Sequence, residues 1–125
     1  MLGEYMHRHY HGRYHSKAQN LRVEVRRAYD EALQKVDVIA MPTIPFTATE
    51  IPPLDAPLGT LIDTALNMQA NTCTFDVTGH PAFTVPCGHK NGLPIGLMLV
   101  GRHFDEATLI RLASVIEAGG EGRQH

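Results

Sequence analysis

The sequence predicts an α/β fold with three strands and about three helices. Three features support this class: amphipathic helical patterns towards both ends of the chain, short apolar runs of strand length between them, and a proline-rich stretch after the first strand. The 125 residues suffice for one domain or for part of one. Hydrophobic residues make up 43% of the chain and charged residues 19%, which is typical of a globular protein and excludes a disordered one.

The first predicted helix covers residues 16–36. Apolar side chains recur along it at steps of three and four, for example at Leu21, Val25 and Ala28, and therefore share one helical face. Ser16 is a suitable N-cap because its hydroxyl can accept a hydrogen bond from a free backbone N–H of the first turn.

A strand and a long loop are predicted next. Residues 37–41 read DVIAM, a run that is too short for a helix and is closed by Pro42, which indicates a buried strand. Five prolines lie within residues 42–59. Because proline fixes its own φ and holds the preceding residue extended, this Pro-rich stretch should be an extended surface loop.

The second half of the chain predicts a helix, a hairpin and a final helix. The helix covers residues 60–73, with Thr60 as its cap, and the two strands cover residues 83–87 and 95–100 around an Asn91-Gly92 turn. The final helix covers residues 105–118.

The ends of that final helix carry recognisable signals. Asp105 is a suitable N-cap, Phe104 can pack against Leu109 as a hydrophobic staple, and Gly119 and Gly120 should end the helix.

The predicted strands have apolar runs without the polar alternation of a half-solvated sheet. Such strands need cover on both faces and neighbours at their sides. We therefore expect the three strands to form the border of a larger sheet.

Charge is unevenly distributed. Residues 1–27 hold six basic and two acidic groups, whereas the remaining residues hold five basic and eleven acidic groups. This pattern can mark a nucleic-acid-binding arm, or a helix that packs on an acidic surface of another segment. We favour the second interpretation and expect no nucleic-acid contact, because the basic residues run into an amphipathic helix.

The composition also bears on the compartment. No run approaches the ~20 apolar residues of a membrane span, so no membrane contact is expected. Two cysteines provide no disulfide framework, which makes the cytoplasm the default location.

Candidate nucleophiles are few. The two serines, Ser16 and Ser114, both fall in predicted helices, and no glycine-rich serine elbow is present. Cys73 and Cys87 fit buried apolar positions better than a thiol dyad. The sequence therefore predicts no catalytic residue.

Three histidines stand four residues apart near the start of the chain, at His7, His11 and His15. On one helix they would form a possible metal site. Gly12 interrupts this helix, so we interpret them as surface histidines and predict neither a metal nor a cofactor.

Several longer segments resemble a known family. They are YHGRYHSKAQNLR, AYDEAL, VDVIAMPTIPFTA, FDVTGHPAFTVPCG and GLPIGLMLVGRHFDEATLIRLASVIE. Together they are similar to the carboxy-terminal part of the amidase signature family, over roughly residues 10–118. The resemblance implies an α/β/α sandwich on a large mixed sheet, of which residues 1–125 would be a carboxy-terminal fragment.

The resemblance also implies a chemistry. Members hydrolyse carboxamides to a carboxylic acid and ammonia or an amine, using a nucleophilic serine, a bridging serine with a cis peptide, and a lysine. That signature lies in the amino-terminal part and has no counterpart here, so the isolated chain should be inactive. Its implied partners are an amino-terminal amidase half, or a further copy through exposed apolar surface, and an amide substrate only in the complete enzyme.

Four substrate-facing residues can be carried over from the family. Thr43 would lie at the strand end, and Gln69, Thr72 and Phe75 would run beside the acyl pocket. In the amidotransferase branch an aspartate that reads the substrate amino group falls at Gln69. A neutral residue there implies a simple aliphatic or aromatic amide as the substrate.

Two other readings stay open at this point. The chain could be a non-enzymatic binding module whose basic, His-rich start contacts metal or nucleic acid. It could also be a subunit that completes an amidase in trans.

Overall fold

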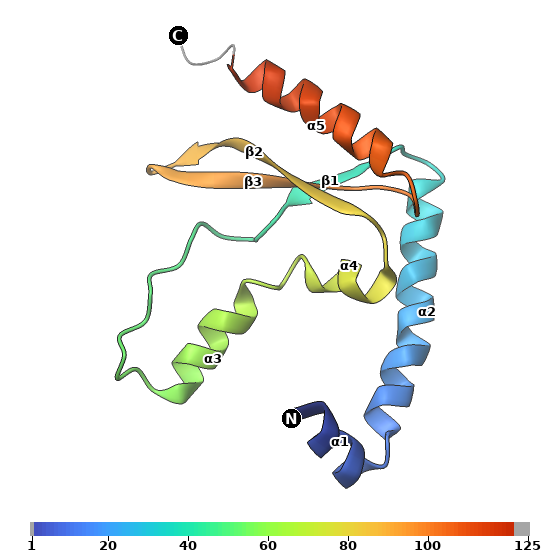
Figure 1. Ribbon diagram of the computed structural model, residues 1–125, viewed down its shortest axis with the longest axis vertical. Coiled ribbons are helices and arrows are strands. Elements are labelled where there is room, and N and C mark those ends of the chain that lie inside the picture. Colours follow the sequence, from blue (N-terminus) through green and yellow to red (C-terminus); the bar gives the residue numbers. More distant parts are fainter. Residues whose placement is uncertain (1, 122–125) are drawn as a thin grey trace.

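The computed structural model of the chain describes residues 2–121. Its elements (Figure 1) are α1 (Leu2–Tyr10), α2 (Arg13–Leu33), β1 (Ile39–Pro42), α3 (Leu58–Asn67), α4 (Cys73–Thr78), β2 (Ala82–Lys90), β3 (Leu93–Val100) and α5 (Glu106–Glu121). The α/β class and the three predicted strands are confirmed, whereas the described residues form five helices rather than about three.

The three strands form one antiparallel sheet in the order β1, β3, β2. Residue Val100 lies opposite Ile39 on one side and Ala82 on the other, so β3 is the central strand. The β2–β3 hairpin turns at Asn91 and Gly92, whose φ values of 54° and 77° suit a tight two-residue turn. Within residues 2–121, the outer edges of β1 and β2 carry no further strand.

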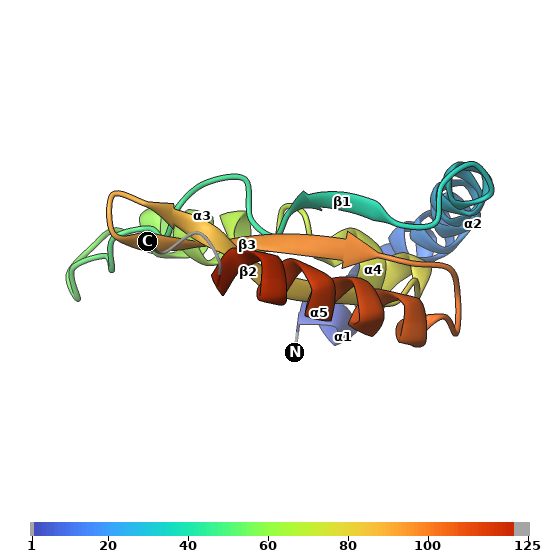
Figure 2. The same cartoon turned by 90° about the horizontal axis from the view of Figure 1, so that it is seen from above.

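Helices cover both faces of β3 (Figures 1 and 2). On one face, α5 packs through Leu109 and Ala113 onto Val85 and Leu99. On the other face, Phe75 of α4 packs with Met98 and Val100, beside Tyr29 of α2. Cover on both faces explains why the predicted strand at this place has an unbroken apolar sequence.

The amino-terminal region differs from the prediction. Helix α2 begins at Arg13 and ends at Leu33, and its N-cap is Gly12 rather than Ser16. A separate helix, α1, precedes it, and the break falls at His11 and Gly12, whose φ values are 49° and 74°. Helix α1 escaped prediction because its nine residues are fewer than the roughly 11–18 residues over which helical periodicity is read.

Arg102 anchors the end of α2 to the end of the sheet. Its Nε donates a hydrogen bond to the Leu33 carbonyl at 3.0 Å, and its guanidinium also donates to the Val36 carbonyl at 3.2 Å and to Asp37 Oδ1 at 3.3 Å. The last carbonyls of a helix have no partner within the helix, so this side chain satisfies groups that would otherwise depend on water.

The single helix predicted over residues 60–73 is wrong. The chain forms α3 with Pro57 as N-cap, then a turn, then the short helix α4. The backbone N–H groups of Thr72 and Cys73 both bond to the Gln69 carbonyl, at 3.1 and 3.0 Å. This turn tips α4 towards α2, and Gly79, at φ 77°, ends α4.

Helix α5 begins directly after Asp105, and the predicted staple of Phe104 does not form. The hydroxyl of Thr108 donates to Asp105 Oδ1 at 2.7 Å, just ahead of the first turn. Phe104 is 93% exposed and has φ 63°, so it turns away from Leu109 and no hydrophobic staple forms. Helix α5 also continues through the predicted glycine stop to Glu121.

The Pro-rich loop, the two cysteines and the apolarity of the helices can also be compared with the predictions. Residues 43–57 form no helix or strand, as expected for the Pro-rich loop. Cys73 and Cys87 are free and exposed, so the prediction that they are buried is wrong. None of the helices in residues 2–121 combines the length and apolarity needed to cross a membrane.

Candidate functional site

A small polar group lies where β1 ends. Thr43 follows β1 directly, and its backbone N–H bonds to the Gly96 carbonyl of β3 at 2.9 Å. Its hydroxyl oxygen lies 3.1 Å from that of Thr84 on β2. All three strands therefore contribute to one spot on the sheet surface.

Gly96 makes this close approach possible. A Cβ atom at residue 96 would lie 2.8 Å from Thr43 Oγ1 and 2.9 Å from Thr84 Cγ2. These distances are shorter than normal van der Waals contact, so any larger residue would push the two threonines apart.

Asn71 joins the α3–α4 turn to the same spot. Its Nδ2 donates a hydrogen bond of 2.8 Å to the carbonyl of Pro42, the residue before Thr43. The turn that contains Gln69 and Thr72 is thereby held beside the end of β1, although it lies far along the chain.

The structure places the four predicted substrate-facing residues in different surroundings. Thr43 is half-buried in the polar group just described. The Gln69 side chain is exposed while its carbonyl holds the turn, and the Thr72 hydroxyl lies 3.4 Å from that carbonyl. Phe75 is buried, with its ring edge-on to Tyr29 at a centroid distance of 5.3 Å. Their roles towards a substrate stay predictions.

A cavity of about 420 Å³ opens next to Thr43. It lies between the start of the Pro-rich loop and the hairpin, and it is lined by residues 42–47, Lys90 and residues 94–96. Thr43 is the only one of the four predicted residues in this lining. The polar side chains of the lining are those of Thr43, Thr47 and Lys90, so the cavity suits an apolar group with one polar end.

The two serines lie elsewhere. Ser16 is exposed on α2, and the Ser114 hydroxyl donates to the Ile110 carbonyl of its own helix at 3.0 Å. Neither borders the cavity.

The amino-terminal histidines do not share one helix. Helix α1 ends before His11, and His15 belongs to α2, so the predicted spacing of four is interrupted by the break. The side chain of His7 lies outside the described residues.

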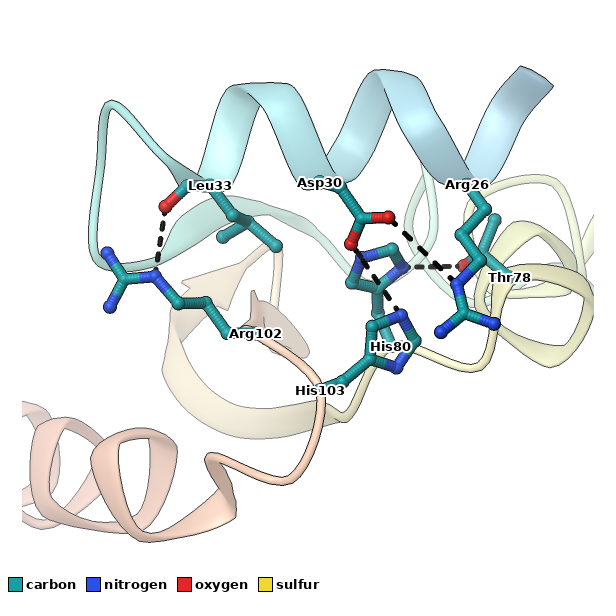
Figure 3. A network of polar contacts seen from close by, with 7 residues as sticks. All are labelled: Arg26, Asp30, Leu33, Thr78, His80, Arg102 and His103. Atoms are coloured by element: carbon teal, nitrogen blue, oxygen red, sulfur yellow. Dashed lines mark hydrogen bonds and ion pairs between the residues drawn. The ribbon is translucent and has the colours of Figure 1, made fainter. Parts of the chain in front are cut away.

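A second polar cluster lies between α2 and two turns at the end of the sheet (Figure 3). His80 has a fully buried side chain, with Nδ1 3.0 Å from Thr78 Oγ1 and Nε2 3.3 Å from Asp30 Oδ1. His103 Nε2 lies 3.7 Å from the same Asp30 oxygen. His80 lies in the turn after α4, and both of its ring nitrogens have hydrogen-bond partners. The cluster could not be found from the sequence, because segments distant in the chain bring its three residues together.

Burial sets the protonation of His80. Removal from water lowers the pKa of the imidazole, and the neighbouring His103 lowers the pKa further, while Asp30 opposes both effects. The neutral ring is therefore the form favoured at neutral pH.

The sequence and fold of the chain match those of known proteins. The sequence model of the Amidase family matches residues 1–110. The enantioselective amidase of Rhodococcus rhodochrous is 51% identical over 110 residues, which cover 87% of this chain and 21% of the relative. An uncharacterized protein in the nthA 5′ region of Rhodococcus erythropolis is 50% identical over 106 residues, covering 85% of this chain and 53% of the relative.

A solved structure shares both fold and sequence. The crystal structure of a Glutamyl-tRNA(Gln) amidotransferase subunit from Thermotoga maritima has a TM-score of 0.65 and 31% identity, over 84% of this chain and 22% of that one. The chain thus spans about half the length of one of these relatives and about a fifth of the other two. By the extent of the family match, the chain belongs to the Amidase family.

Proposed function

We propose that the chain forms the carboxy-terminal part of an amidase, where it closes one side of the acyl pocket. In this proposal, another part of the enzyme carries the two reactive serines and the lysine. The observation that carries it is the cavity beside Thr43, which has a mostly apolar lining and no serine, cysteine or histidine in it.

The polar group around Thr43 supports a role at a substrate. Side chains of β2, the end of β1 and the α3–α4 turn converge there, and Gly96 leaves room for their close approach. Ligand sites often combine a mostly apolar pocket with a few convergent polar groups, and Thr43 lies at such a place.

Unpaired strand edges and exposed apolar side chains support the proposal that another protein segment packs against this chain. The sheet has unpaired outer edges in residues 2–121, and exposed strand edges invite further pairing. Helix α3 also buries none of its residues, and it exposes Leu58, Leu61, Ile62 and Leu66. An amino-terminal amidase part is the partner that fits both features.

The substrate class follows from the lining and from Gln69. A mostly apolar cavity suits an aliphatic or aromatic acyl group. An uncharged side chain at position 69 provides no counter-charge for the ammonium group of an α-amino-acid amide. We therefore propose simple aliphatic or aromatic amides as substrates, and a cytoplasmic enzyme because both cysteines are free thiols.

A transplant tests the proposal. The segment of the Rhodococcus rhodochrous amidase that matches this chain is replaced by residues 1–110, and hydrolysis of acetamide and benzamide is measured. The chimera should hydrolyse at least one of them, since the two chains are 51% identical over 110 aligned residues. A folded, monodisperse chimera without activity would contradict the proposal.

A further inference from the structure

The cluster of Asp30, His80 and His103 has the composition of a metal site. Two imidazoles and one carboxylate form a ligand set that zinc accepts in proteins. One ligand atom from each residue lies within 4.8 Å of the other two. The residues come from α2, from the turn after α4 and from the loop after β3, so the fold and not one motif assembles them (Figure 3).

The distances suit a small cation. Ligand bonds of about 2.1 Å at tetrahedral angles place ligand atoms about 3.4 Å apart. Here Asp30 Oδ1 lies 3.3 Å from His80 Nε2 and 3.7 Å from His103 Nε2. Both distances from Asp30 are therefore close to the spacing that an ion requires, and the two imidazole rings, whose centroids lie 4.2 Å apart, would turn to bring both Nε2 atoms onto it.

One polar atom of the cluster lacks a partner. His103 Nε2 is buried, and within the described residues it makes no hydrogen bond. A buried nitrogen without a partner costs free energy, and such an atom calls for a physical explanation. Coordination of an ion held by Asp30 and His80 would satisfy it.

The neighbouring groups orient the ligands. Thr78 is fully buried and lies 3.0 Å from His80 Nδ1. Without an ion, Nε2–H can donate to Asp30 while the Thr78 hydroxyl donates to Nδ1; with an ion on Nε2, the ring proton would lie on Nδ1 and Thr78 would accept it. Arg26 Nε lies 4.0 Å from Oδ2 of Asp30. The second carboxylate oxygen, Oδ1, therefore remains available to the two imidazoles.

Exposure and charge also suit an ion. The Asp30 side chain is 44% exposed, which leaves room for a water ligand in the fourth position. The carboxylate of Asp30 also supplies a negative charge to the ligand set.

We propose that Asp30, His80 and His103 bind one Zn²⁺ ion, with a water molecule as fourth ligand. The ion would fasten α2 to the two turns at the end of the sheet. This site is separate from the Thr43 cavity, and the proposal does not depend on the proposed function.

Calorimetric titration tests this proposal with ZnCl₂ as the probe. The full untagged chain is treated with EDTA, desalted and titrated at pH 7.5. One equivalent should bind, and His103→Ala and Asp30→Asn should each weaken the affinity by at least about tenfold. Thr78→Val, which removes only the partner of Nδ1, should weaken it by about 10- to 100-fold.

The matched control is the double variant His11→Ala/His15→Ala, which removes two exposed histidines outside the cluster and should leave the affinity unchanged. X-ray absorption at the zinc edge should show two imidazole ligands, and circular dichroism checks that each variant is folded. The proposal is overturned if the chain takes up no zinc, if Asp30→Asn binds as well as the parent chain, or if the control loses the binding instead.

Discussion

The hydroxyl oxygens of Thr43 and Thr84 lie 3.1 Å apart over Gly96, although 41 residues separate them in the chain. The pairing of β1 and β2 on either side of β3 creates this contact. Of the two residues, Thr43 lines the mostly apolar cavity of the proposed acyl pocket, and Thr84 lies behind it on β2.

Gly96→Ala should destabilise the chain by about 1–3 kcal/mol, because the added Cβ would overlap both threonines. The free energy of unfolding is measured by urea denaturation. Gly59→Ala is the control, since an added Cβ there meets nothing within 4 Å and helix α3 tolerates alanine well. Equal stability of Gly96→Ala and the parent chain would show that the threonines are not held as described.

Arg102→Ala should lower the free energy of unfolding by about 1–2 kcal/mol, because it leaves the Leu33 and Val36 carbonyls without this donor. Arg102→Lys should recover only part of the loss, since an ammonium group cannot reproduce the guanidinium fork. Arg22→Ala, on the exposed side of α2, is the control and should change stability by no more than about 0.5 kcal/mol. Equal changes in the free energy of unfolding for Arg102→Ala and Arg22→Ala would contradict the anchoring role of Arg102.

Stability should fall as the pH is lowered below about 6.5, because His80 is held neutral in the folded chain while it takes up a proton readily in the unfolded chain. The charged and titratable groups facing the ring are His103, Asp30 and Arg26. The loss should begin near the unfolded pKa and level off below the lower, folded pKa. Urea midpoints between pH 8 and pH 5 measure it.

His80→Gln should flatten this pH dependence, and His89→Gln, at an exposed position of the hairpin, should leave it unchanged. A parent chain that grows more stable between pH 6.5 and pH 5 would reverse the predicted sign.

In the active chimera, Gln69→Asp should favour alaninamide over propionamide, two amides that differ by one amino group. A carboxylate at position 69 can pair with the ammonium group, and an exposed pair of this kind contributes up to about 1 kcal/mol, or roughly fivefold in relative kcat/KM. Asn67→Asp adds the same charge two residues away as a control. If both variants shift the ratio equally, position 69 does not read the amino group.

The sequence predicted the parts of the fold that local pattern controls. The apolar spacing around Leu21 and Val25 located α2, and the Asn91-Gly92 turn located the hairpin. The break at residues 68–72 was missed because hydrogen bonds to the Gln69 carbonyl and the contact of Asn71 with Pro42 decide it. The position of this turn therefore depends on packing between segments that are distant in the sequence.

For the sites, too, some residues could be identified from the sequence and others only from the fold. Thr43 could be named from its place after a strand and from the family resemblance. Thr84 and Gly96 could not, since their closeness to Thr43 depends on the strand order. The cluster of Asp30, His80 and His103 spans three segments, and no spacing in the sequence signals it.

The central claim is that this chain supplies a wall of an amide-binding pocket and not the reactive groups. The most direct test is the rate of acetamide and benzamide hydrolysis by the purified 125-residue chain, followed by release of ammonia beside a heat-denatured control. The account predicts no turnover above that control. Sustained turnover that scales with the concentration of the chain would contradict it.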